Sequence, residues 1–149
     1  MEAEVYPDPR VEALIRDNLV PIRIDVRGKP EPMERFNVQW TPTILLLGPD
    51  GREHHRIEGF LETGDFLAQL LLGLGHVARA RGKWDEAIPR YEEVLARHPD
   101  GDAAPAAQYW RGVARYKKSG DPAELGATTQ AFKERYADTP WATRASVWG

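Results

Sequence analysis

The chain has 149 residues, a hydrophobic fraction of 42% and a formal net charge of −3, which suits one ordinary domain or two small ones. Acidic and basic residues are interspersed rather than blocked, so nothing indicates a nucleic-acid partner. There is no cysteine, so these residues form no disulfide and offer no thiolate to a metal. We find neither a signal peptide nor an apolar run long enough to span a bilayer, and expect a soluble, cytoplasmic protein without membrane contact, cofactor or metal.

The first predicted element is an amphipathic helix that ends at about Asn18. Asp8 is a good N-cap and Pro9 suits the first helical position. Apolar residues then follow at helical spacing: Val11, Leu14, Ile15 and Leu19. The alternating, β-branched stretch Val20–Val26 predicts a strand with Pro21 near its beginning, where a missing N–H is tolerated.

A loop from Gly28 to Pro32 and a short helical segment from Glu31 to Phe36 lead to a second strand region. Thr43–Leu47 is continuously apolar, as in a strand covered on both faces. The turn Pro49–Gly51 predicts an antiparallel return over Glu53–Glu58. Gly59 ends that strand.

A longer helix follows the hairpin. Thr63 is placed to cap it, so that it begins near Gly64 or Asp65. Its apolar face is formed by Phe66, Leu67, Leu70, Leu71 and Leu74.

This order of elements, from Val5 to Leu72, resembles a thioredoxin domain from the second half of its active-site helix onward. The matching pieces are Ile22–Asp25, Phe36–Val38, Thr41–Thr43, Asp50–Gly51 and Ile57–Gly59. The resemblance implies a cis peptide bond before Pro42, although an ordinary strand-entry loop is the alternative. It also implies that the loop presents its backbone to an extended partner, which makes Trp40, Thr41, Pro42 and Thr43 candidate contact residues. Trp40 could instead be a core aromatic.

The resemblance further implies a central strand, between Val20–Val26 and Thr43–Leu47, that this chain lacks. Without it, rows of backbone N–H and C=O groups need other partners. The two flanking strands could pair directly, or a second copy could supply a strand in a swapped homodimer. The third alternative is a natural protein that begins upstream of Met1 and carries the Cys-x-x-Cys pair there.

The second half is rich in small and aromatic residues at helical spacing. Gly75 and Ala87 are small enough to let two helices cross closely, Tyr91 fills the space between the helices, and Pro99 ends the second one. The full set of matching residues is Leu71, Leu74, Gly75, Ala78, Ala87, Tyr91, Val94 and Pro99. This set resembles the tetratricopeptide repeat. We expect the inter-helix turn at Gly82–Asp85, with Asp85 as the cap, and a tolerated Pro89 near the start of the second helix.

A second, longer and degenerate copy follows the first. Its first helix carries Ala107, Tyr109, Trp110, Gly112, Val113 and Tyr116, and Phe132, Tyr136 and Pro140 repeat the roles of Tyr91 and Pro99. Residues 141–148 open a third helix pair or form a cap. Because such arrays usually need about three units, we expect the thioredoxin-like half to supply a packing surface.

Few residues suggest catalytic chemistry. His54 and His55 are adjacent on a strand and point to opposite faces, so they cannot chelate one ion together. The inner helices of the repeats should instead line a concave face with aromatic and basic side chains: Gln69, His76, Arg79, Tyr109, Tyr116 and Lys117. Such a face suits a peptide with acidic or C-terminal carboxylate groups, although both tyrosines could simply pack between helices.

The sequence thus predicts an α/β part, an incomplete thioredoxin-like sheet with flanking helices over residues 1–72, and an all-α part of tetratricopeptide-like hairpins over residues 73–149. The favoured function is a non-catalytic module that binds a protein or peptide. The alternative is a truncated thiol–disulfide oxidoreductase whose redox pair lies upstream, since thiol chemistry needs cysteine.

Overall fold

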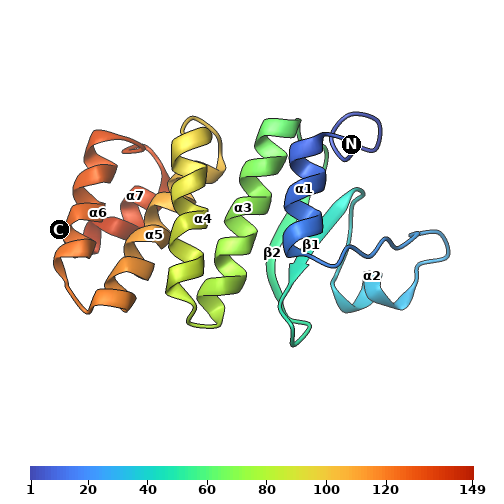
Figure 1. Ribbon diagram of the computed structural model, residues 1–149, viewed down its shortest axis with the longest axis horizontal. Coiled ribbons are helices and arrows are strands. Elements are labelled where there is room, and N and C mark those ends of the chain that lie inside the picture. Colours follow the sequence, from blue (N-terminus) through green and yellow to red (C-terminus); the bar gives the residue numbers. More distant parts are fainter.

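The computed structural model describes residues 1–149, as seven α-helices, two strands and one short 3₁₀ helix (Figure 1). The first half contains α1 (Pro9–Asn18), α2 (Glu31–Arg35), β1 (Thr43–Leu47) and β2 (Glu53–Glu58). The second half contains α3 (Thr63–Ala80), α4 (Trp84–Arg97), α5 (Ala103–Ser119), α6 (Ala123–Glu134), α7 (Pro140–Ala145) and η1 (Ser146–Trp148). No helix combines the length and the apolarity needed to cross a lipid bilayer.

The helix starts are only partly as predicted. Asp8 does cap α1, because its carboxylate accepts a hydrogen bond from the backbone N–H of Arg10 at 2.9 Å, with Pro9 in the first turn. Thr63 does not cap α3: the helix begins one residue earlier than expected, and Glu62 takes the N-cap position without a side-chain bond. Asp85 does not cap α4 either. It lies in the first turn, where its carboxylate suits the helix dipole and pairs with Lys118 at 2.5 Å.

The sheet is a single antiparallel hairpin, β1 paired with β2, with an irregularity between Leu46 and Leu47. Ile44 lies opposite Ile57 in this register, and side chains of that parity point to one face. Leu46 and Ile57 are buried there against α3, so the hairpin uses its apolar face to cover that helix.

The predicted strand over Val20–Val26 is absent. The segment leaves α1 and leads outward toward α2 without joining the sheet (Figure 1). A strand forms only when its N–H and C=O groups bond to a neighbouring strand. The resemblance implies that the neighbour of Val20–Val26 is the central strand, which this chain lacks. Direct pairing of this segment with β1, one of the three expected outcomes, therefore does not occur.

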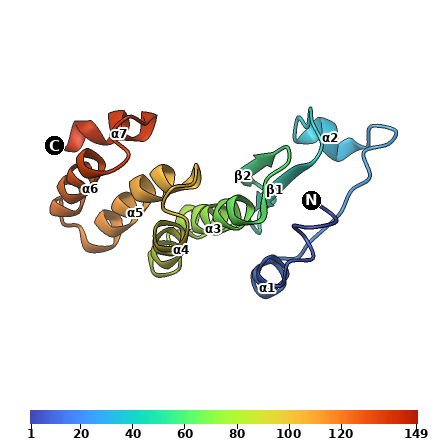
Figure 2. The same ribbon diagram turned by 90° about the horizontal axis from the view of Figure 1, so that it is seen from above.

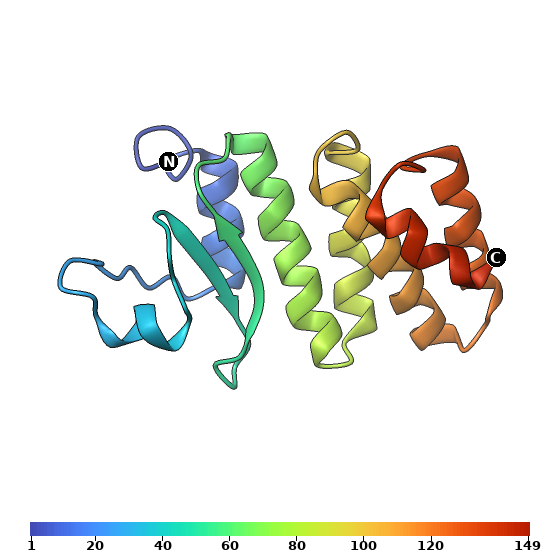
Figure 3. The same ribbon diagram turned by 180° about the vertical axis from the view of Figure 1, so that it is seen from behind.

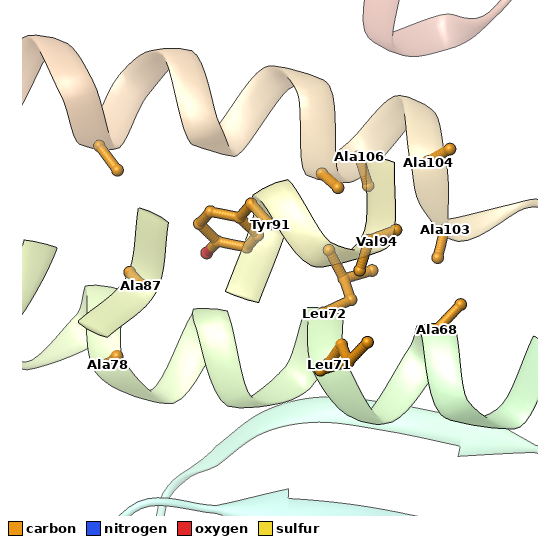
Figure 4. Packing of buried hydrophobic residues seen from close by; sticks show 12 residues of the cluster. Ala68, Leu71, Leu72, Ala78, Ala87, Tyr91, Val94, Ala103, Ala104 and Ala106 are labelled. Carbon is orange, nitrogen blue, oxygen red and sulfur yellow. The ribbon is translucent and has the colours of Figure 1, made fainter. Parts of the chain in front are cut away.

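Helix α3 is the element on which both halves pack. One core, on the thioredoxin-like side, combines Val5, Val11, Leu46, Ile57, Phe66, Leu67 and Leu70. The other, in the helical half, is centred on the fully buried Ala87, Tyr91 and Val94 of α4 (Figure 4). Leu71 and Leu72 of α3 belong to this second core, so the helix runs without a break across the expected boundary at residue 72.

The helical half consists of two hairpins, α3–α4 and α5–α6, followed by the short helix α7 and by η1. In the first hairpin, a Cβ at Gly75 would lie 2.5 Å from the Tyr91 ring, so only glycine lets α3 and α4 approach this closely. In the second, the same holds for Gly112 of α5, where a Cβ would lie 2.0 Å from Thr128 of α6. Pro89 is accommodated in the second turn of α4, on an exposed face.

The hairpin and α7 lie on one side of the molecule, and α4 lies on the other. Figure 2 shows this most directly: α3 and α5 lie in the middle, with β1–β2 and α7 on the same side of them. From behind, the strands run alongside α3, and α7 crosses α5 (Figure 3). The residues on this side of α3 and α5 are therefore flanked by the sheet at one end and by α7 at the other.

Candidate functional site

A row of aromatic rings, one of them buried and the others half-buried, connects the sheet to the C-terminal helix. We define the aromatic row by the members whose ring centres follow one another at 4.8 to 6.4 Å: His55 of β2, His76 of α3, Trp110 and Tyr109 of α5, Trp141 of α7 and Trp148 of η1. Offset and edge-to-face pairs at such distances are favourable. The row thus links five elements along the side that carries both β2 and α7.

The sheet end of the row consists of two uncharged histidines. His76 is buried, and its Nδ1 is hydrogen bonded to the Tyr91 hydroxyl at 2.9 Å. Burial lowers the pKa of His76 to about 3, and the nearby His55 and Arg79 act in the same direction. His55 hydrogen bonds with Gln69 Oε1 at 2.8 Å, and burial lowers its pKa as well. This end is therefore polar but without charge at neutral pH.

Arg79 supplies a positive charge in the middle of the row. Its guanidinium carbon lies 3.8 Å from the centre of the Trp110 ring, a close cation–π contact. Its Nε is buried and has no hydrogen-bond partner. No carboxylate lies within ion-pair distance of Arg79, in contrast to Arg56 and Arg115, which pair with glutamates.

The far end of the row is formed by three large rings. Tyr109 stacks on Trp148 with 4.8 Å between ring centres and 26° between planes, and it also contacts Trp141. Arg144 lies over the Trp141 ring at 4.6 Å. Thr139 caps α7 by accepting a hydrogen bond from the Ala142 N–H at 3.3 Å. This cap fixes the start of α7 and with it the position of Trp141. Aromatic faces with a guanidinium above them are suited to peptide groups and to carboxylates.

Comparison with protein families accounts for both halves of the molecule. A model described as thioredoxin-like domain matches residues 1–73, and a model described as tetratricopeptide repeat matches residues 72–136. The chain joins a thioredoxin-like domain to a tetratricopeptide repeat. The two matches meet inside α3. No curated protein and no solved structure matches the chain.

In the thioredoxin-like domain, the loop expected to contact a partner has the predicted backbone. The peptide bond between Thr41 and Pro42 is cis. The Thr43 hydroxyl donates to the Trp40 carbonyl at 2.6 Å and fixes the loop locally. Trp40 is 68% exposed, so the alternative of a core aromatic is wrong. The loop contributes no ring to the aromatic row, so the expected contact residues fall in two separate places.

In the tetratricopeptide repeat, the structure gathers some of the predicted residues and leaves others apart. Gln69, His76, Arg79 and Tyr109 lie in or beside the aromatic row. Tyr116 is half-buried near the end of α5 and makes no ring contact with the row, and Lys117 is exposed with no ion pair. Tyr109 packs between elements, which was the alternative to a binding role, but its side chain remains half-buried.

Four members of the row escaped the sequence-based prediction: His55, Trp110, Trp141 and Trp148. His55 belongs to the other half of the chain, and nothing in a helical pattern indicates that a strand packs on α3. The sequence pattern places Trp141 and Trp148 only in a third helix pair or a cap. The signal was present in composition, because three of the five tryptophans fall between residues 110 and 148, and partly exposed tryptophans are typical of binding surfaces.

Proposed function

We propose that this chain is a non-catalytic module that binds an extended peptide of a partner protein along the aromatic row, with a carboxylate of that peptide held by Arg79. The observation that carries the proposal is the state of Arg79: a guanidinium on a tryptophan face, with a buried Nε and no carboxylate partner. Buried or half-buried charges normally have a counter-ion, and a guanidinium forks naturally onto a carboxylate.

The neighbours of Arg79 favour an uncharged or acidic peptide over a basic one. His76 and His55 stay neutral at pH 7 because burial lowers the pKa of each, so Arg79 and Arg144 are the charged groups in contact with the row's rings. The rings of Trp110, Trp141 and Tyr109 offer flat surfaces for apolar side chains and peptide planes. The exposed loop Trp40–Thr43 offers a second contact region in the other half.

The test uses peptide arrays that differ only in charge and terminus. Decapeptides with acidic residues or a free C-terminal carboxylate should bind, and the same peptides with amide in place of carboxylate should bind at least about tenfold more weakly, because charge-assisted bonds to arginine are strong. Tryptophan fluorescence should change on binding, since the row contains three tryptophans.

The decisive variant is Arg79→Ala, compared with Arg81→Ala as its control. Arg81 follows two residues later at the end of the same helix and is exposed without an ion pair. We expect Arg79→Ala to abolish the preference for a free carboxylate while Arg81→Ala keeps it. Equal binding of acidic and amidated peptides by the unaltered chain would contradict the proposal.

A second candidate is suggested by the thioredoxin-like half, in which a segment with a strand's sequence has no strand beside it. In that case a longer natural protein would supply the cysteine pair and the central strand, and would act as a thiol–disulfide oxidoreductase. Reading the DNA upstream of Met1 in frame is the first test, and insulin reduction by the longer protein is the second. These 149 residues alone should reduce no insulin, because they contain no thiol.

A further inference from the structure

The segment Val20–Val26 has the sequence of a strand and none of its bonds. Its apolar side chains alternate with polar ones, and all four are exposed: Val20 is 89%, Ile22 82%, Ile24 47% and Val26 36% accessible. The only backbone hydrogen bond of the segment is the turn bond from Lys29 N–H to the Val26 carbonyl. A row of free N–H and C=O groups beside exposed β-branched side chains is a template for pairing with another strand.

The order of charges within the segment makes it complementary to itself. In an antiparallel pairing of two copies centred on Ile24, Arg23 of each copy lies opposite Asp25 of the other. Ile22 then lies opposite Val26, so the apolar side chains share one face and the two ion pairs share the other. Opposite charges and β-branched residues directly across an antiparallel pair are both stabilising.

The proline fits the same register. Because neighbouring residues alternate in the direction of their N–H groups, a ladder that uses Ile22, Ile24 and Val26 leaves Pro21 pointing outward, where no N–H is needed. Arg23 and Asp25 then occupy the closer, non-hydrogen-bonded pairs. Their present partners, Glu2 and Arg27, are on the same chain and exposed, and such pairs contribute little that would oppose an exchange.

We propose that two copies of this chain associate through Val20–Val26, paired antiparallel about a two-fold axis at Ile24. The inference does not depend on the peptide-binding role of the aromatic row. A short ladder buries less area than a permanent interface, so the dimer should be weak and concentration-dependent. Sedimentation from about 1 µM to about 1 mM chain should show a monomer–dimer equilibrium, and a monomer throughout that range overturns the proposal.

The absence of native cysteine allows a sharp test of the register. Twin residues at Ile24 face each other with about 5.5 Å between Cα atoms, which lies inside the range that a disulfide bridges. Ile24→Cys should therefore form a cross-linked dimer under mild oxidation. Ile22→Cys is the control, because its twin lies four residues out of register, about 14 Å away along the strand. Equal cross-linking of the two variants contradicts the register. So does cross-linking of Ile24→Cys that is as efficient in urea as in buffer.

Charge reversal tests the ion pairs. Arg23→Asp places two acidic residues opposite two others, and Asp25→Arg places arginines opposite arginines, so each variant alone should dimerise at least about tenfold more weakly. A mixture of the two variants restores both opposite-charge pairs and should form heterodimers. The double variant Arg23→Asp with Asp25→Arg restores both opposite-charge pairs within a homodimer, so it should dimerise as the unaltered chain does. A mixture that stays monomeric, or larger assemblies in place of dimers, would overturn the proposal.

Discussion

The two halves of this molecule differ in how completely they bury their apolar residues. In the helical half, Ala87, Tyr91 and Val94 of α4 are fully enclosed between α3 and α5. The whole chain has eight exposed large hydrophobic residues, and seven of them lie in the thioredoxin-like half, between Val20 and Phe60. The same chain therefore carries a closed core and an open one, joined by α3.

The difference follows from how helices and strands satisfy their backbones. A helix makes its own hydrogen bonds, so a hairpin such as α3–α4 needs only a neighbouring helix to bury its apolar stripe. A strand depends on neighbours that come from elsewhere in the chain or from another molecule. The hairpin β1–β2 survives because α3 covers its apolar face, whereas Val20–Val26 has neither a ladder nor a cover.

The largest effect should come from the centre of the closed core. Tyr91→Ala removes a fully buried ring that packs against Gly75 and whose hydroxyl bonds to His76. We expect a loss of about 3–5 kcal/mol in the free energy of unfolding, from lost burial and the cavity left behind. Urea denaturation measures it. Tyr91→Phe separates the contributions, because it removes only the hydroxyl and should cost about 1–3 kcal/mol.

Two glycines offer a matched test of close helix packing. Gly112→Ala would place a Cβ 2.0 Å from the Thr128 hydroxyl oxygen, so α5 and α6 must separate, at a cost of about 1–3 kcal/mol. Gly126→Ala, on α6 in the same hairpin, meets no atom within 4 Å and should stabilise by about 1 kcal/mol, because alanine favours the helix. Thermal melts of the two variants should move in opposite directions, and a shift in the same direction would mean that the helix spacing is adjustable.

Acidification should weaken the junction of the two halves. His76 has a folded pKa of about 3 against an ordinary value of 6.5, so below pH 6.5 the unfolded chain binds a proton that the folded chain does not. Stability therefore falls as the pH drops, by about 2 kcal/mol between pH 7 and pH 5. The lowered pKa of His55 acts with the same sign.

The variant His76→Gln separates this histidine from other titrating groups, because glutamine carries no proton in this range. Urea midpoints at pH 7 and pH 5 should differ less in the variant than in the unaltered chain. An equal drop in both proteins would assign the pH dependence to groups outside the aromatic row.

Much of the fold follows from the sequence, apart from two helix caps and one strand. The helix at Pro9–Asn18, the hairpin after Pro42 and the two helical hairpins are all present, since caps, turns and helical spacing act over a few residues. Val20–Val26 has an equally strong strand pattern and forms no strand. A strand pattern shows that the segment can pair, but it does not show whether a neighbouring strand is present to pair with it.

The candidate site was harder to predict for the same reason. Arg79, His76 and Tyr109 lie on inner helices, where repeat position alone indicates them. Trp110 also lies on α5, beside Tyr109, and contacts His76 and Arg79 directly. Trp141 joins them only because α7 folds back across α5, and His55 only because β2 packs on α3 (Figure 3). Tyr116 and Lys117 were expected at the site, yet they lie in the last turn of α5, where nothing from the row reaches them.

The smallest effect should be found in the open half. Ile22 is 82% exposed, so Ile22→Ala removes side-chain atoms that touch solvent, and the monomer should change its stability by less than about 0.5 kcal/mol. Ile57→Ala, a buried residue of β2 in the same half, should cost about 2–5 kcal/mol. Urea denaturation must be carried out at low micromolar chain, because a dimer would add stability that depends on concentration. If Ile22→Ala matches the cost of Ile57→Ala under those conditions, the strand-like segment packs within one chain, and the contrast between the two halves disappears.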